Sequence, residues 1–335
     1  MHDWSLTSGQ TWSLITLNKS GAEASSYWSP ATIDAQYSVG FTWARLMTVR
    51  LAKTFADGKA TAAFAIENPA MQVAGQAPGA PVATPIFGGT GTSQLGNGNT
   101  YSANLAPDLI AKVAFDPVYG HYEIKALGRF FRDRIGEVAA TNTTAGNPGS
   151  NQTTYGGGIG AGAILPVVSK KVDVIVQGLA GRGTGRYGDS LSTDVTYRTN
   201  GSLSPVQNVQ ALAGVEAQAT PKLNLYFYSG DEYLGRNTYG TGKTATGYGL
   251  TSVNTAPCFL TNSNSCSAIT KNLVQGTGGF WYNIYKGAYG TLRYGMQYSY
   301  TYKDTWRGTG ATATSPNAPK ANENMAFTSI RYYLP

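Results

Sequence analysis

The stretch from residue 290 to residue 304 reads GTLRYGMQYSYTYKD and alternates apolar or aromatic residues with small or polar ones. Successive side chains of a β-strand point to opposite faces, so this stretch predicts a strand with two unlike faces. One face would carry Leu292, Tyr294, Met296, Tyr298, Tyr300 and Tyr302, and the other Thr291, Arg293, Gly295, Gln297, Ser299 and Thr301. We expect the first face to meet lipid and the second to meet the lumen of a barrel.

The same pattern recurs along the chain in pairs of segments joined by short turns. Long loops rich in Gly, Asn, Thr and Ser separate the pairs. A transmembrane β-barrel alternates short and long connections in this way between strands of about 10 residues. The sequence therefore predicts an all-β fold, a transmembrane antiparallel β-barrel. Its twelve visible strands are expected at residues 4–17, 41–55, 59–67, 107–116, 120–132, 153–165, 171–186, 207–218, 222–233, 272–285, 290–304 and 324–335.

Composition supports one barrel domain over residues 1–335. Only 13% of residues are charged, against about 25% in soluble domains, whereas Tyr numbers 22 and Gly 42. No run of 18 apolar residues predicts a membrane helix. The formal net charge is +7, but lysines and arginines occur in runs of no more than two, scattered along the strands. We assign these charges to the lumen and expect no nucleic-acid partner.

The end of the chain fits the same class. Residues 324–335 form an amphipathic strand, as expected of the closing strand of a barrel. If this strand descends to the periplasm, every short turn lies on the periplasmic side and every long loop outside. Residue 1 leads directly into a strand without a signal peptide. Because an outer-membrane protein must be exported, we expect its leader to lie outside this sequence. The predicted location is the bacterial outer membrane.

Cys258 and Cys266 are the only cysteines, and both lie in the long loop at residues 234–271. Two cysteines in one extracellular loop favour a disulfide in an oxidising compartment. The alternative is a pair of free thiols.

Signatures of catalysis are weak. The chain has two histidines, His2 and His121, and lacks the G-x-S-x-G and H-E-x-x-H motifs. The glycine-rich run at residues 156–160 lacks the Lys-Ser/Thr of a phosphate loop, and the adjacent Asp231 and Glu232 would point to opposite faces of a strand. We therefore predict no catalytic residues, no metal site and no cofactor.

The early part of the chain narrows the class. It carries Gly9-Gln10-Thr11-Trp12-Ser13, then Pro30-Ala31-Thr32-Ile33-Asp34-Ala35-Gln36-Tyr37, Gly40 and Val49-Arg50-Leu51. These segments resemble the DcaP-like trimeric porins of Gram-negative outer membranes. The resemblance covers residues 1–55 specifically and is general elsewhere. It implies a sixteen-stranded homotrimer that passes small anions such as dicarboxylates through an arginine-lined constriction. It also implies an internal Met1, with about four strands and the leader preceding it.

The sequence as a whole predicts an outer-membrane porin for passive diffusion of small, preferably anionic solutes such as carboxylates. Lumen cations would lower the barrier for anions and raise it for cations. The candidate pore-lining residues, by strand parity, are Arg50, Arg129, Arg293, Arg331, Lys112 and Lys125. Alternatively, each could pair with Glu67, Asp116, Glu123 or Glu216 and stabilise the wall. Two rival classes stay open: an outer-membrane barrel enzyme or adhesin, and a secreted soluble β-rich binding protein.

Overall fold

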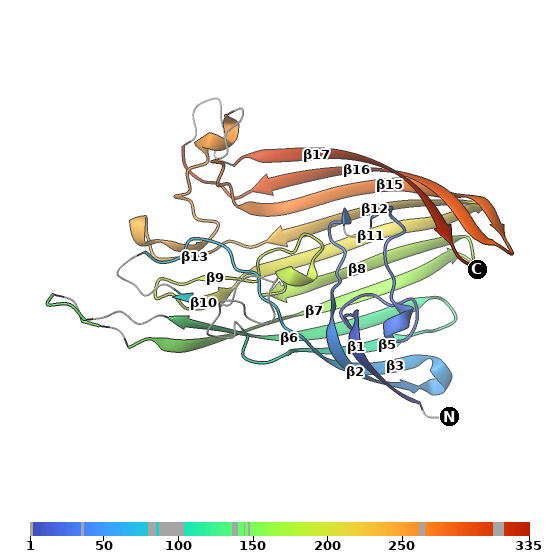
Figure 1. Cartoon of the computed structure of the whole chain (residues 1–335), viewed down its shortest axis with the longest axis horizontal. Coiled ribbons are helices and arrows are strands. Elements are labelled where there is room, and N and C mark those ends of the chain that lie inside the picture. Colours follow the sequence, from blue (N-terminus) through green and yellow to red (C-terminus); the bar gives the residue numbers. More distant parts are fainter. Residues whose placement is uncertain are drawn as a thin grey trace.

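The computed structural model describes residues 3–34, 37–79, 85–86, 104–135, 140–143, 145–146, 148–260, 265–310 and 318–335. Twelve long strands form one antiparallel sheet, and each pairs with the next long strand in the sequence (Figure 1). The strands are β1 (Trp4–Trp12), β2 (Arg45–Phe55), β3 (Ala60–Glu67), β5 (Asp108–Phe115), β6 (His121–Ile135), β7 (Ser150–Val168), β8 (Val172–Arg182), β11 (Gln207–Thr220), β12 (Leu223–Leu234), β15 (Thr270–Gly287), β16 (Gly290–Thr305) and β17 (Lys320–Tyr333). The predicted antiparallel fold with twelve strands is confirmed.

The sheet is open between its first and last strands. In the described residues, β1 pairs only with β2, and β17 only with β16. Short turns connect the strands at one end of the sheet, the end at which both termini lie in Figure 1. The described residues of the long loops after β3, β6, β8, β12 and β16 lie at the other end or on the concave face.

The remaining elements are short. They are strands β4 (Pro85–Ile86), β9 (Val195–Tyr197), β10 (Leu203–Pro205), β13 (Asn237–Tyr239) and β14 (Thr246–Tyr248), and 3-10 turns η1 (Ala24–Ser26), η3 (Ala56–Gly58), η4 (Gly185–Tyr187), η5 (Gly242–Thr244) and η6 (Ala256–Phe259). None of these turns is long and apolar enough to cross a membrane as a helix.

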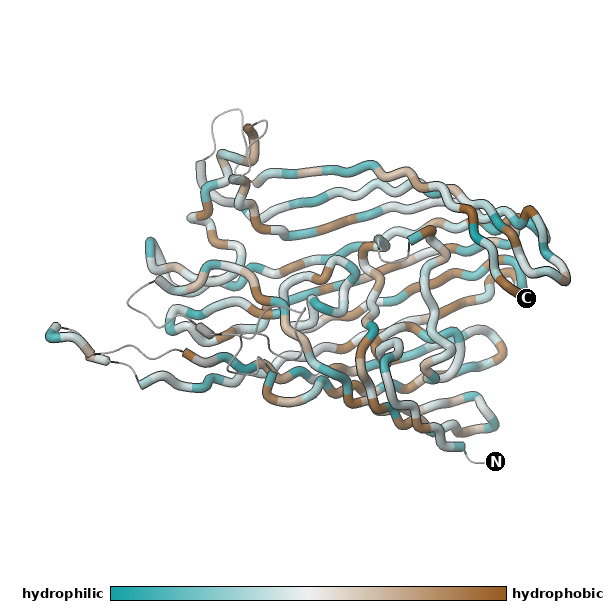
Figure 2. The backbone as a smooth tube through the Cα atoms, viewed as in Figure 1, coloured by the Kyte–Doolittle hydropathy of each residue, from teal (hydrophilic) through white to brown (hydrophobic). Residues whose placement is uncertain are grey.

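The two faces of the sheet differ as the alternation predicts. On β16, Met296 and Tyr298 are about half exposed on the convex face, whereas Gln297 and Ser299 are buried on the concave face. Hydrophilic and hydrophobic residues alternate along the long strands in Figure 2. The exposed face is rich in Leu, Ile, Val, Phe and Tyr side chains. This apolar outer face is the surface expected of a wall in contact with lipid.

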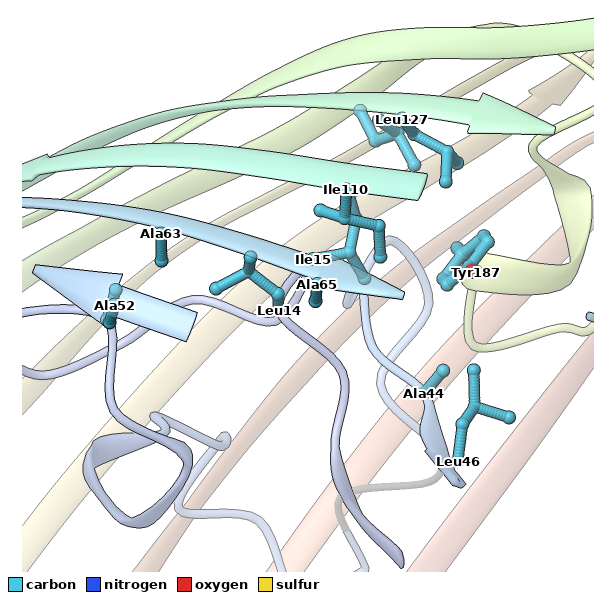
Figure 3. Close-up of a cluster of buried hydrophobic side chains, with 12 residues drawn as sticks. Leu14, Ile15, Ala44, Leu46, Ala52, Ala63, Ala65, Ile110, Leu127 and Tyr187 are labelled. Carbon is cyan, nitrogen blue, oxygen red and sulfur yellow. The ribbon is translucent and has the colours of Figure 1, made fainter. Parts of the chain in front are cut away.

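Three predicted strand boundaries are wrong. Residues 13–17 and 41–44 leave the sheet, because pairing of β1 with β2 ends at Trp12 opposite Arg45. Residues 183–186 also lie outside β8, since a turn begins at Gly183, whose φ is +74°. In all three places the chain folds onto the concave face instead of extending the sheet. Figure 3 shows Leu14 and Ile15 packed there against the wall.

Candidate functional site

The described residues 13–34 and 37–44, here called the inner segment, cross the concave face of the sheet (Figure 1). Its first part is fastened to carboxylates of the wall. The Leu14 amide donates to Glu67 Oε1 (2.8 Å), and the Asn18 amide donates to Glu123 Oε2 (3.1 Å). Wall carboxylates thereby satisfy backbone groups that left the strand ladder, as buried N–H groups require.

The second part of the inner segment is fastened to the other half of the sheet. Its backbone amides donate to polar side chains on β16, β15 and β12. The three bonds join Ile33 to Gln297 (2.6 Å), Val39 to Gln275 (3.1 Å) and Gly40 to Glu232 (3.0 Å). The segment thus bridges two distant parts of the wall.

Gly40 shows why the sequence permits this close approach. Its φ is +83°, a region that favours glycine. A Cβ at this position would lie 1.9 Å from the carbonyl oxygen of Ala211 on β11. Only a residue without a side chain fits between the inner segment and the strand.

A second inward fold follows β8 and is held by Arg129. The guanidinium pairs with Asp108 (3.1 Å) at the start of β5 and with Asp194 (2.6 Å) in the loop. It also donates to the carbonyl oxygens of Gly183 (2.7 Å) and Ala70. Arg129 is 1% exposed. Its charge therefore anchors loops to the wall.

Three other predicted pore residues are covered in the same way. Arg50 is 2% exposed and donates to the carbonyl oxygens of Ala22 (3.0 Å) and Trp12. Lys112 and Lys125 are each 1% exposed, and both pair with Glu123, at 2.8 Å and 3.0 Å. These cations lie on the inner face, as parity predicts. They nevertheless face the inner segment or the wall, so in this structure they do not line open space.

The remaining two predicted residues, Arg293 and Arg331, line a hollow near the short turns. This basic hollow has a volume of about 640 Å³. Its walls carry five cations and two carboxylates: Lys19, Lys170, Lys171, Arg293 and Arg331 with Asp173 and Glu216. Glu216 accepts hydrogen bonds from Trp28 Nε1 (3.1 Å) and the Tyr228 hydroxyl (2.8 Å). Its walls therefore carry a net positive charge.

The two arginines are held by an aromatic ring and by hydrogen bonds to neutral groups, Arg293 to the Tyr333 hydroxyl and Arg331 to the carbonyl oxygen of Ile33. The guanidinium carbons of Arg293 and Arg331 lie 4.3 Å and 4.7 Å from the ring centre of Trp281. Trp281 is itself fixed by its Nε1–H bond to the carbonyl oxygen of Ala31 (2.7 Å). Within the described part of the chain, neither arginine pairs with a carboxylate, and Arg293 Nε has no hydrogen-bond partner. The stack holds two uncompensated cations at the hollow, since cation–π contacts orient a charge without neutralising it.

A second hollow lies near the long loops. This acidic hollow has a volume of about 670 Å³, and Asp189 and Glu323 are the charged residues on its walls. Tyr37 of the inner segment stacks on Phe327 at its edge, with ring centres 6.2 Å apart. Burial, and then the neighbouring carboxylate of Glu232, raise the pKa of Asp189 to about 8. The Trp43 indole N–H donates to Asp189 (3.1 Å).

Cys258 and Cys266 are joined by a disulfide, with their Cα atoms 4.4 Å apart. The bridge begins in η6, and neither cysteine lines either hollow. Its place in a long loop agrees with a role in shaping that loop.

The sequence did not point to Trp281 or to the lysines of the basic hollow. Lys170 and Lys171 form a short turn, which says nothing about a neighbouring hollow. The start of the inner segment is predicted as strand from its alternation. In the structure, Leu14, Ile15 and Leu17 are instead all fully buried on the concave face. Two adjacent apolar residues, Leu14 and Ile15, break strict alternation and could have marked the departure from the sheet.

Known proteins resemble this chain in fold. No family model and no curated protein matches the sequence. The outer membrane channel DcaP of Acinetobacter baumannii superposes with a TM-score of 0.58 at 13% identity, over 98% of this chain and 71% of that chain. The chain has the fold of an outer-membrane channel. A Pseudomonas aeruginosa FadL homologue aligns over 99% of this chain and 80% of its own, with a TM-score of 0.32 and 10% identity. The likeness to DcaP confirms the predicted class of fold.

Proposed function

We propose that this protein is an outer-membrane porin that lets small, preferably anionic solutes such as carboxylates diffuse passively, and that it has no catalytic role. The channel fold supports the first part, and the excess of cations at the basic hollow supports the preference for anions. We further propose that it works as a homotrimer in the outer membrane of a Gram-negative bacterium, following the resemblance in its early sequence.

The proposed preference for anions rests mainly on two neighbouring arginines. Arg293 and Arg331 lie beside Trp281 with no carboxylate partner in the described residues. A solute anion can therefore provide the missing countercharge. Low-dielectric walls strengthen such a field, so the pair would concentrate anions in the passage.

The dimensions of the hollow suit a small solute. Its volume of about 640 Å³ falls within the range of roughly 300–1,000 Å³ found for small-molecule pockets. Lys19 and the turn lysines Lys170 and Lys171 widen the basic surface around the arginines. A carboxylate could enter while keeping part of its hydration shell.

Single-channel recording tests this assignment. Each of Arg293→Ala and Arg331→Ala should shift the reversal potential in a KCl gradient toward cations. At about 7 Å in water, one unit charge attracts an anion and repels a cation by about 0.6 kcal/mol each. Loss of the charge changes the difference between the two ions by about 1.2 kcal/mol, so the anion-to-cation permeability ratio should fall roughly sevenfold for each substitution. Arg307→Ala is the matched control, because Arg307 is an exposed loop residue outside the walls of both hollows.

Two results would contradict the proposed function or its selectivity. A channel whose reversal potential is the same in the wild type, both arginine variants and the Arg307 control would show that these arginines do not set selectivity. A purified and folded protein that forms no pore would contradict the porin function itself.

A further inference from the structure

The two hollows carry opposite charge at opposite ends of the same strands. Arg331 of the basic hollow and Glu323 of the acidic hollow are both on β17. At about 3.4 Å per residue, they lie roughly 27 Å apart along the strand. On β16, Arg293 and Thr301 line the two hollows in the same order.

The inner segment separates the hollows and contributes to both. Residues 27–32 line the basic hollow, and Tyr37 and Val39 line the acidic one. The two sets of wall residues have no member in common. A solute crossing the barrel would therefore meet the two charged regions one after the other.

The charge difference between the hollows is pronounced. The described walls of the basic hollow carry five cations against two carboxylates. Those of the acidic hollow carry Asp189 and Glu323 and no lysine or arginine. Their separation of roughly 27 Å exceeds the Debye length of about 10 Å at 0.1 M salt. Each hollow therefore sets its own ion population at moderate ionic strength.

We propose that the channel rectifies ionic current, passing more current when the side bearing the long loops is positive. This inference rests on the proposed porin function. With that polarity, anions from the basic hollow and cations from the acidic hollow are both driven toward the inner segment, so carriers accumulate between the hollows. With the opposite polarity both ions are drawn away, the region is depleted and its conductance falls.

The effect should depend on pH through Asp189. The groups that face it are the carboxylates of Glu232 on β12 and Asp34 of the inner segment, together with the indole N–H of Trp43. Burial and these like charges keep Asp189 largely protonated at neutral pH. Rectification should therefore increase as the pH rises through about 8, while lysines and arginines remain charged.

The test is a current–voltage curve for single channels in 0.1 M KCl at pH 9, repeated at pH 6. The orientation of each channel can be read from Lys222→Cys on the exposed β11–β12 turn. A maleimide-linked polymer tethered there should lower the current only when added on the short-turn side. The wild type at pH 9 should pass about twofold or more current with the long-loop side positive.

Substitutions test whether the acidic hollow causes the rectification. Asp189→Asn combined with Glu323→Gln should make the curve symmetric while the channel stays anion-selective. Asp57→Asn, a change of one carboxylate in the exposed β2–β3 turn, should leave rectification intact. In 1 M KCl, where the Debye length is about 3 Å, the wild type should also become nearly symmetric.

Two outcomes separate this inference from the function on which it rests. An anion-selective wild-type channel with a symmetric curve at pH 9 would overturn rectification and leave the porin function standing. Rectification that persists in the double variant would also overturn it, because the acidic hollow would not be the cause. Absence of any pore in correctly folded protein would overturn both.

Discussion

At the scale of single residues, four buried cations stabilise the concave face of the wall. Arg50, Arg129, Lys112 and Lys125 are each no more than 2% exposed, and each has a hydrogen-bonded or charged partner. A buried charge is tolerated only when its partners replace water. Arg293 and Arg331 also donate hydrogen bonds, but they line the basic hollow, whereas these four are covered. Selectivity is therefore expected to depend on the arginines beside Trp281.

Glu123 is the carboxylate on which two of these cations depend. It pairs with Lys112 and Lys125, whose side chains are fully buried. Glu123→Gln should lower stability by about 3–5 kcal/mol, because it leaves two buried cations uncompensated. The measurement is the denaturant midpoint of the folded form in detergent. Asp57→Asn serves as the control for loss of one carboxylate, and an equal midpoint for the two variants would contradict the structural role of Glu123.

Arg50 provides a second test of the same idea. Arg50→Ala would leave the carbonyl oxygens of Ala22 and Trp12 without their donor, at a cost of about 1–3 kcal/mol for each orphaned group. We expect a lower midpoint of thermal unfolding and an unchanged reversal potential. A large shift of the reversal potential with unchanged stability would show that Arg50 lines the pore and does not serve mainly to stabilise the wall.

Asp189 should make stability depend on pH. Its pKa rises from 3.8 to about 8 on folding, so the folded state keeps a proton that the unfolded state has lost. Stability should therefore be greatest in acid, fall as the pH rises from about 4 to about 8, and level off above that range. Asp189→Asn should flatten this slope in a series of thermal unfolding scans. A slope identical to that of the wild type would show that another group is responsible.

Among the elements, the sequence predicts the long strands but not the segments that fold onto the concave face of the sheet. Alternation on β16 places Gln297 inward and Met296 outward, as found. Alternation is a local property, and it cannot tell whether an inward residue meets water or another segment. Parity thus placed Arg129 and Arg331 on the same face, although one is covered by loops and the other lines a hollow.

The position of the inner segment depends on Gly40. Gly40→Ala would place a methyl group 1.9 Å from the carbonyl oxygen of Ala211, which should displace the segment, lower stability and raise single-channel conductance. Gly58→Ala is a matched control, since Gly58 has a φ of +90° and nothing within 4 Å of an added Cβ. That control should lower the free energy of unfolding only by the backbone strain of about 1–2 kcal/mol. Equal effects of the two substitutions would argue against steric displacement.

At the scale of the whole molecule, the chain combines an apolar outer surface with a filled and charged interior. The outer face suits lipid, and the inner segment divides the interior into a basic hollow and an acidic one. In the function that we propose, a solute would meet fixed charges at each end of its path. The net charge of +7 is a poor guide to function by itself, because several of its cations are buried in structural pairs.

The reversal potential of the wild-type channel in a KCl gradient at low ionic strength tests the proposed preference for anions. We expect an anion-selective potential that weakens in concentrated salt, because screening shortens the reach of the arginines beside Trp281. A cation-selective potential would contradict the preference for anions and would leave only the barrel fold supported.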